Sequence, residues 1–242
     1  HGELMPYGTP IYFDGEYKED KLYPLYIQKI RCRFKLKPHK IPTIQIKGNS
    51  RFHPNRYLTT SGDEPATLYL TNIDLQLFRD HYEIYEPEYL SGWKFQGVHG
   101  EKLFGEYIRK WTYIKVQSKE KGNWGMYLIA KLMLNNLYGK FGSDIEMQHK
   151  MPYIGKDNKL HFKLSEVETK EGIYIPVACF VTSYARDNLV RAAQMIEDDY
   201  FADKSKNRFI YCDTDSLHID SPELKLPEWL DIHPTKLGAW DH

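Results

Sequence analysis

The segment from Arg208 to Asp220 constrains the fold most strongly, because it combines two short β-type runs with a polar turn. The first run is Phe209-Ile210-Tyr211-Cys212 and the second is Leu217-His218-Ile219. Asp213-Thr214-Asp215-Ser216 lies between them and has the composition of a hairpin tip. The sequence therefore predicts a β-hairpin that presents two carboxylates at its turn.

The spacing of Asp213 and Asp215 suggests a chemical role. Side chains two residues apart project to the same side of an extended backbone, and two carboxylates about 4 Å apart repel by roughly 4 kcal/mol at an intermediate effective dielectric. A divalent cation would offset this repulsion, and Mg²⁺ commonly takes one or two carboxylates together with substrate phosphates. The pair predicts phosphoryl or nucleotidyl transfer at a metal ion, although most Asp-x-Asp turns are only solvated turns.

Composition narrows the class of protein. A chain of 242 residues with 41% hydrophobic residues can form one sizeable core or two small ones. Three widely separated cysteines indicate neither a disulfide framework nor a zinc site, which is typical of a reducing, intracellular setting. No apolar run approaches the ~20 residues of a membrane span.

The net charge of zero conceals a strong segregation of charge. Residues 28–56 contain nine Lys/Arg and no Asp/Glu, whereas residues 57–92 contain seven Asp/Glu and one Arg. A locally basic surface can bind a phosphate backbone even when the whole domain is neutral.

The first part of the chain is predicted to be β-structure with turns. Strict alternation from Lys29 to Lys37 places four apolar side chains on one face and five basic side chains on the other. The basic face fits a solvated surface and a binding surface equally well.

Thr71-Asn72-Ile73-Asp74 predicts the start of a helix, and the apolar side of this helix would be Leu75, Leu77, Phe78 and Tyr82. A strand with a glycine kink is expected over residues 89–95.

The middle of the chain shows helical periodicity. One helix is predicted from Leu103 to a break at residues 119–123, and a second from Trp124 to Tyr138 with Gly139 in the capping position. Lys131, Asn135 and Tyr138 share one face of the second helix, although a merely solvated lysine fits the same pattern. The side chains expected to pack on this helix are Ile129, Leu132, Met133 and Leu137.

The remaining segments alternate between polar and apolar. Residues 143–172 are turn-rich, and Gly155-Lys156-Asp157-Asn158 predicts a hairpin turn. Residues 173–181 predict a buried strand, after which Thr182 or Ser183 would cap a helix that ends near residue 199. Arg186 would then lie in the first turn, where the helix dipole disfavours a cation and a bound phosphate would explain it.

Two of these segments together resemble signature motifs of family B DNA polymerases. Residues 131–142, KLMLNNLYGKFG, resemble the fingers motif Lys-x-x-x-Asn-Ser-x-Tyr-Gly, with Asn136 where the family usually has Ser. Residues 211–216, YCDTDS, resemble the palm motif Tyr-x-Asp-Thr-Asp-Ser and follow in the right order at the right distance. Residues 111–115 and 182–186 resemble one subgroup of this family in particular, the protein-primed polymerases of phi29-like phages.

The resemblance implies a role for each matching residue. Asp213 and Asp215 match the palm carboxylates that hold the catalytic Mg²⁺ or Mn²⁺ ions. The residues that match contacts to the incoming nucleotide are Lys115, Lys131, Asn135 and Tyr138. The residues that match contacts to the primer-template DNA are Gly139, Thr182 and Arg186.

The resemblance also implies an architecture. We expect an α+β fold, with an antiparallel palm sheet and helices, helical fingers and small β-rich insertions. Residues 1–102 and 143–170 would be insertions that contact the terminal protein, residues 103–142 the fingers, and residues 171–242 the palm with the catalytic hairpin.

One expected motif of the family is missing. Its third carboxylate lies in Asp-x-x-Ser-Leu-Tyr-Pro, and no such stretch occurs in this sequence. Asp20-Lys21-Leu22-Tyr23-Pro24 does not replace it, because its Asp lies three residues before the Tyr instead of five and the Ser is absent. The chain begins at His1 without an initiator Met, so we expect a segment of a longer polymerase.

The sequence therefore predicts a DNA-directed DNA polymerase that is inactive, or nearly so, as this segment alone. Its expected partners are primer-template DNA, deoxynucleoside triphosphates and a terminal protein, with no membrane, in the cytoplasm of a host that carries the phage or plasmid. One alternative is a non-catalytic module that binds DNA or terminal protein. Another is a metal-dependent nuclease built on Asp213 and Asp215, which would leave the Lys131 helix without a role.

Overall fold

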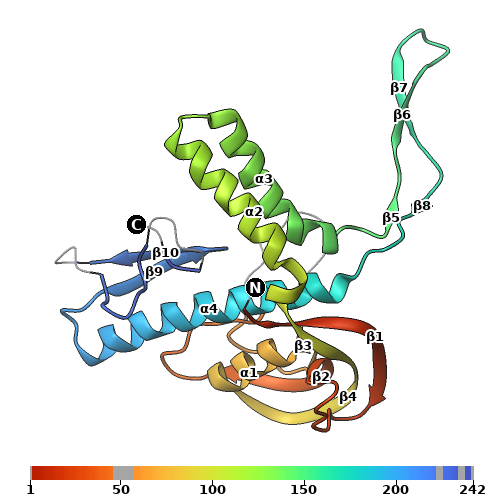
Figure 1. Cartoon of the computed structure of the whole chain (residues 1–242). Helices are drawn as coiled ribbons and strands as arrows, with labels where there is room; N and C mark the ends of the chain where they lie inside the picture. Colours follow the sequence, from red (N-terminus) through yellow and green to blue (C-terminus); the bar gives the residue numbers. More distant parts are fainter. Residues whose placement is uncertain (1, 46–56, 222–225, 234–237, 241–242) are drawn as a thin grey trace. The chain divides into compact units, whose positions relative to one another are not determined.

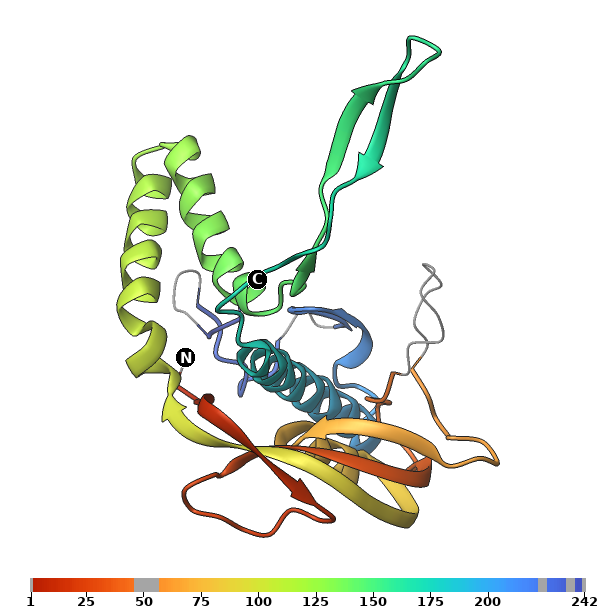
Figure 2. The same cartoon turned by 90° about the vertical axis from the view of Figure 1, so that its right-hand side faces the viewer.

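The computed structural model describes residues 2–45, 57–221, 226–233 and 238–240. The chain divides into two compact units, one formed by His1–Glu106 with Phe180–His242 and the other by Tyr107–Cys179. Antiparallel strands and helices make up both units (Figures 1 and 2). The predicted α+β class is confirmed. The four predicted functional domains stay a prediction, because two units defined by contacts do not test them.

The first unit is built on a four-stranded antiparallel sheet with the order β1-β4-β2-β3. Its strands are β1 (Leu4–Asp14), β2 (Leu25–Leu36), β3 (Ala66–Thr71) and β4 (Tyr82–His99). β2 is central, so both of its edges are paired and its side chains alternate between the core and the outer face. The alternation predicted for Lys29–Lys37 is confirmed, because Ile30, Cys32 and Phe34 are buried while Arg31 and Lys35 are exposed. The sequence also predicts a second alternating segment over residues 43–47, and this segment runs into residues 46–56, outside the described residues.

β4 is longer than the predicted strand and runs without interruption through Gly92. A Cβ atom at Gly92 would lie 2.3 Å from Cζ of Phe13 and 2.4 Å from the carbonyl oxygen of Ile27. This close approach of neighbouring strands, rather than a kink, is why glycine occupies the position.

The core of the first unit lies between the sheet and α1 (Asn72–His81). The predicted helix start is confirmed, because the Thr71 side chain accepts a hydrogen bond from the N–H of Asp74 at 3.1 Å. The predicted apolar side is also confirmed, although Tyr82 begins β4 instead of ending the helix. The fully buried aromatic rings of this core are Phe34, Phe78 and Tyr82.

The strand predicted for residues 173–181 is wrong, because most of this segment belongs to α4 (Ile175–Ala202). Pro176 occupies its first turn, where a proline has no helical hydrogen bond to lose. Buried side chains then recur at helical spacing, as at Val177 and Phe180. Thr182 and Ser183 consequently lie inside the helix instead of capping it.

The second unit contains most of one helix, the whole of the next helix and a β-ribbon. α2 (Gly100–Glu120) ends at the predicted break, and α3 (Trp124–Phe141) is capped at its start by Asn123, whose side chain accepts from the N–H of Met126 at 3.1 Å. The ribbon comprises β5 (Glu146–Met147) paired with β8 (Glu168–Thr169), and β6 (Lys150–Ile154) paired with β7 (Leu160–Leu164). The turn predicted at residues 155–158 is confirmed, since it joins β6 to β7. Among the described residues, no helix is long and apolar enough to cross a membrane.

Lowering the pH is expected to destabilise the first unit through His81. This residue is 3% exposed, and its Nδ1 lies 2.8 Å from the carbonyl oxygen of Ile41, which can only accept, so Nδ1 carries the proton. Burial lowers the pKa of His81 below the ordinary value of 6.5, against the opposing effect of the Ile41 carbonyl. The neutral ring therefore contributes stability that is present above pH 6.5 and is lost as the pH falls through the folded-state pKa.

Urea unfolding at pH 7.5 and pH 5 measures this effect. The variant His81→Asn retains a donor for Ile41 but does not titrate, so its free energy of unfolding should fall less at pH 5 than that of the native chain. The exposed His99 provides the control variant His99→Asn. An equal loss in the native chain and in His81→Asn would show that another group senses the pH.

Candidate functional site

The predicted catalytic hairpin is present. β9 (Arg208–Asp213) pairs with β10 (Ser216–Asp220) in antiparallel register, with Asp213 opposite Ser216. Only Thr214 and Asp215 lie between the strands, so both predicted carboxylates come from the tip. Asp213 and Asp215 are exposed, which leaves their oxygens accessible to a cation or a substrate.

The backbone at the tip differs from the extended form that the spacing argument assumed. Thr214 has a φ of 52°, and the N–H of Asp215 donates to the carbonyl oxygen of Asp213 at 2.6 Å. Ser216 donates its hydroxyl to the same carbonyl at 3.1 Å, and Thr214 donates to Oδ1 of Asp213 at 3.0 Å. A tight turn, rather than the alternation of a strand, therefore carries the two carboxylates.

Replacing Thr214 by glycine is expected to stabilise the hairpin. A β-branched residue is disfavoured at positive φ, and such strain costs on the order of 1 kcal/mol, which glycine avoids. We expect Thr214→Gly to raise the free energy of unfolding by up to about 1 kcal/mol in urea titrations, after the entropy cost of glycine. The control Thr67→Gly, in β3, should instead lower it. A destabilised Thr214→Gly would show that the bond to Asp213 outweighs the strain.

The donor set at the tip fits a hard divalent cation, because it consists of carboxylate oxygens. Within the described parts of the chain, no group of three or more His, Cys, Asp or Glu side chains is arranged to hold a metal ion. Asp213 and Asp215 would hold Mg²⁺ or Mn²⁺ together with ligands from elsewhere, such as substrate phosphates.

The predicted nucleotide-binding residues lie in the second unit. Lys131, Asn135 and Tyr138 are exposed along α3, as their spacing predicts, and Lys115 is partly buried on α2. Their contacts with nucleotide stay predictions, because the hairpin belongs to the other unit.

Two local expectations for α3 are wrong. Gly139 lies inside the helix, and Gly142 is the capping residue. Ile129 and Leu132 are each 48% exposed, whereas Ala130 is the buried residue of this helix. Apolar side chains occur on every side of α3, so their spacing alone could not select the buried face.

Arg186 lies in the interior of α4, so the argument from the helix dipole does not hold. Its Nη1 forms an ion pair with Oδ1 of Asp74 on α1. A protein carboxylate thus takes the place of the phosphate that the sequence argument required. Thr182 lies one turn earlier on the same helix and is partly buried.

Tyr57 is a residue near the hairpin that the sequence did not single out. Burial raises the pKa of its phenol, Cys212 raises it further, Arg186 lowers it and Asp213 raises it. The phenol is therefore close enough to sense both the carboxylate tip and Arg186. Its backbone forms a bridge with Gln45, and the next residue, Leu58, donates its N–H to the carbonyl of Ile44 at 2.8 Å. No local motif marks Tyr57, because these neighbours are far along the chain.

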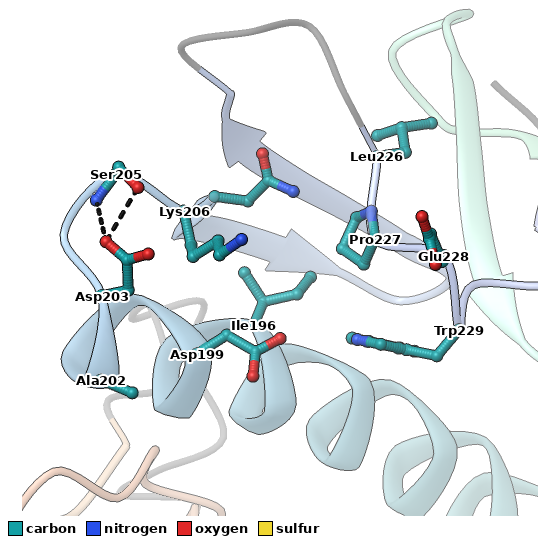
Figure 3. A pocket seen from close by; sticks show the side chains of 11 residues that line it. Ile196, Asp199, Ala202, Asp203, Ser205, Lys206, Leu226, Pro227, Glu228 and Trp229 are labelled. Carbon is teal, nitrogen blue, oxygen red and sulfur yellow. Dashed lines mark hydrogen bonds between the residues drawn. The ribbon is translucent and has the colours of Figure 1, made fainter.

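A pocket of about 520 Å³ lies between the end of α4, the loop before β9 and residues 226–229 (Figure 3). Asp203 accepts the backbone N–H of Ser205 at 3.0 Å and its hydroxyl at 2.8 Å, and these bonds lower the pKa of Asp203. None of the residues predicted to bind metal, nucleotide or DNA lines this pocket. The candidate site therefore remains the hairpin tip.

Comparison with known proteins places the chain in a family. Residues 2–227 match the family described as DNA polymerase type B, organellar and viral. The chain therefore belongs to this family of DNA polymerases, as the two motifs predicted.

Several of the relatives are phage DNA polymerases. The chain is 47% identical over 240 residues to the DNA polymerase of Bacillus phage Nf, an alignment that covers 98% of this chain and 39% of the relative. It is 45% identical over 244 residues to the DNA polymerase of Bacillus phage phi29, covering 100% of this chain and 40% of the relative. The chain thus spans about 40% of the length of these two relatives.

A solved structure supports the fold over the whole chain. The structure described as phi29 DNA polymerase complexed with primer-template DNA and incoming nucleotide substrates matches with a TM-score of 0.87 and 45% identity. The match covers 100% of this chain and 40% of that one. The predicted resemblance to phi29-like polymerases is confirmed.

Proposed function

We propose that this chain is the nucleotide-adding part of a protein-primed DNA-directed DNA polymerase. The observation that carries the proposal is the hairpin tip, on which both Asp213 and Asp215 are exposed, in a chain similar throughout its length to phage DNA polymerases. The reaction is the transfer of a deoxynucleotide to a primer terminus.

Each predicted residue has a chemical role in this reaction. Asp213 and Asp215 would hold the divalent cation, which would supply positive charge to activate the primer 3′-hydroxyl and to stabilise the leaving pyrophosphate. Lys131 and Lys115 place positive charge at the triphosphate, where negative charge develops. Asn135 and Tyr138 lie beside the incoming base pair. The DNA backbone is contacted by Gly139, Thr182 and Arg186.

The partners follow from the same reasoning. The solved relative is described as bound to primer-template DNA and incoming nucleotides, and we assign the same two ligands to this chain. A terminal protein would supply the priming hydroxyl, as in the protein-primed subgroup, and replication would take place in the host cytoplasm. The ion required would be Mg²⁺ or Mn²⁺.

The isolated chain is proposed to bind these ligands with little or no synthesis. Its 242 residues lack the Asp-x-x-Ser-Leu-Tyr-Pro motif that supplies another metal-binding carboxylate in the family. Substantial templated incorporation of labelled nucleotide by the purified chain would contradict this part of the proposal.

The test is the binding of a labelled primer-template and a deoxynucleoside triphosphate with and without Mg²⁺. Asp215→Ala should abolish the effect of the metal, and Lys131→Ala should weaken nucleotide binding. Asp220→Ala and Lys140→Ala are the matched controls. Asp220 is exposed on the same hairpin as Asp215 and Lys140 on the same helix as Lys131, and neither control residue occupies a position that the two motif patterns specify. Binding that is indifferent to Mg²⁺ and to both substitutions would overturn the proposed nucleotide site.

A further inference from the structure

We propose that Asp74 is a positioning residue that orients Arg186 toward a DNA phosphate. The inference rests on the proposed function, in which Arg186 contacts the primer-template backbone. Asp74 belongs to α1 and Arg186 to α4 (Figure 1), and both residues lie in the first unit. Arg186 is among the residues matched to the polymerase motifs, but nothing in its own sequence neighbourhood identifies Asp74 as its partner.

Both carboxylate oxygens of Asp74 are engaged. Oδ1 accepts from Nη1 of Arg186, and Oδ2 accepts the hydroxyl of Ser183 at 2.6 Å. Thr71 Oγ1 lies 3.1 Å from Oδ2 of Asp74 and 2.9 Å from Oγ of Ser183, and its single proton serves one of them. The Asp74 side chain is only 13% exposed, while Thr71 and Ser183 are buried. The carboxylate is therefore held in one orientation by neighbours that water does not reach.

Arg186 remains open on its other side. Its side chain is 40% exposed, and a guanidinium has five N–H donors in a planar fork, of which a carboxylate engages one or two. The remaining donors can bind an external oxygen anion, and the rigid fork suits the geometry of a phosphate. Holding this long side chain in place before binding reduces the entropy lost when DNA binds.

A second arginine on the same two helices provides a contrast. Arg191 donates to Asp187 at 2.8 Å and to Asp80 at 3.0 Å, so two carboxylates compensate its charge. Arg186 has a single carboxylate partner among the ion pairs of the described residues. The two arginines both link α4 to α1, but the Arg186–Asp74 pair is electrically neutral, whereas Arg191 with its two carboxylates carries one net negative charge. A phosphate is therefore repelled less at Arg186 than at Arg191.

Removing the charge of Asp74 should change the affinity for DNA in opposite directions, depending on whether Asp74 orients Arg186 or only repels the phosphates. Loss of a negative charge near bound DNA would by itself strengthen binding, because repulsion of the phosphates decreases. If Asp74 orients Arg186, its loss instead weakens binding, because the guanidinium is no longer aimed at the phosphate. The direction in which the DNA affinity changes therefore distinguishes a positioning role from simple electrostatic repulsion.

The experiment measures the affinity of the full 242-residue chain for a fluorescein-labelled primer-template by anisotropy at several salt concentrations. We expect Asp74→Asn and Arg186→Ala each to weaken binding about tenfold, with the double variant no weaker than Arg186→Ala alone. The slope of log affinity against log salt is negative, and Asp74→Asn and Arg186→Ala should each reduce its magnitude by about one, as expected for one lost phosphate contact. Asp80→Asn and Arg191→Ala are the controls and should leave the affinity and the slope unchanged.

Thermal unfolding accompanies each measurement. If Asp74→Asn does not fold, Ser183→Ala replaces it, because this change removes the hydroxyl from Oδ2 and keeps both charges; weakened binding by Ser183→Ala is then the expected result. Unchanged or tighter binding by the Asp74 or Ser183 variant, with Arg186→Ala weakened, would overturn the positioning role and leave the DNA contact intact. If folded Arg186→Ala binds as well as the native chain, the proposed DNA contact of Arg186 itself fails.

Discussion

Replacing Asp215 by asparagine in a full-length polymerase that contains this chain is expected to lower templated nucleotide addition at least about 10³-fold. The change keeps the size of the side chain but removes the charge that would hold the catalytic cation. A cation at such a site contributes several kcal/mol to transition-state stabilisation, and about 4 kcal/mol corresponds to three powers of ten in rate. The measurement is the rate of single-nucleotide extension of a labelled primer at saturating nucleotide and Mg²⁺.

The structure supplies the control for this prediction. Asp215 is exposed in a turn, so its replacement should leave the free energy of unfolding nearly unchanged. Asp220→Asn, at the other end of β10, changes the same charge on the same hairpin and should retain most of the activity. An Asp215→Asn enzyme within tenfold of the native rate would exclude Asp215 as a direct ligand of the catalytic ion.

Truncation of Phe34 to alanine should be the most destabilising of the substitutions considered for this chain. Phe34 is 1% exposed and packs edge-on against Phe78 and Tyr82, with both ring centroids at 5.3 Å. Replacing a buried phenylalanine by alanine costs about 3–5 kcal/mol, because apolar contact is lost and a cavity remains. That loss is a large fraction of the 5–15 kcal/mol that stabilises a typical domain.

Urea unfolding of the two variants Phe34→Ala and Leu22→Ala tests this expectation. Leu22 is 72% exposed, so its truncation should change the free energy of unfolding by less than about 0.5 kcal/mol. Because Phe34 lies in the first unit, the unfolding of that unit should be followed separately, for example by the fluorescence of Trp93. A loss below 1 kcal/mol for Phe34→Ala would mean that the aromatic cluster can close around the missing ring.

Several local features of the fold followed directly from short sequence patterns. The alternation around Cys32, the helix start at Thr71 and the hairpin at residues 208–220 each depend on neighbours a few positions apart. Hydrogen bonds and side-chain periodicity at that range are set by the residues themselves. The two motifs likewise predicted the polymerase family, because their residue types, order and spacing are specific in combination.

Other features depended on residues distant in the chain. The apolar segment before Thr182 has a composition that suits a buried strand as well as a helix, and a short apolar run does not distinguish them. In the structure it forms part of α4, whose buried side chains follow a helical period over a much longer span. The tight turn at Thr214 similarly required backbone angles that composition alone does not provide.

The environment of Arg186 shows where inference from the sequence ended. The sequence placed a cation near the start of a helix and supplied a phosphate as its partner. The tertiary structure placed the same cation inside α4, beside a carboxylate 112 positions earlier in the chain. Local patterns determine secondary structure and the identity of the reactive groups, because both depend on adjacent residues. The partners of those groups are decided only when packing brings remote elements together, since burial and charge pairing have no fixed range in sequence.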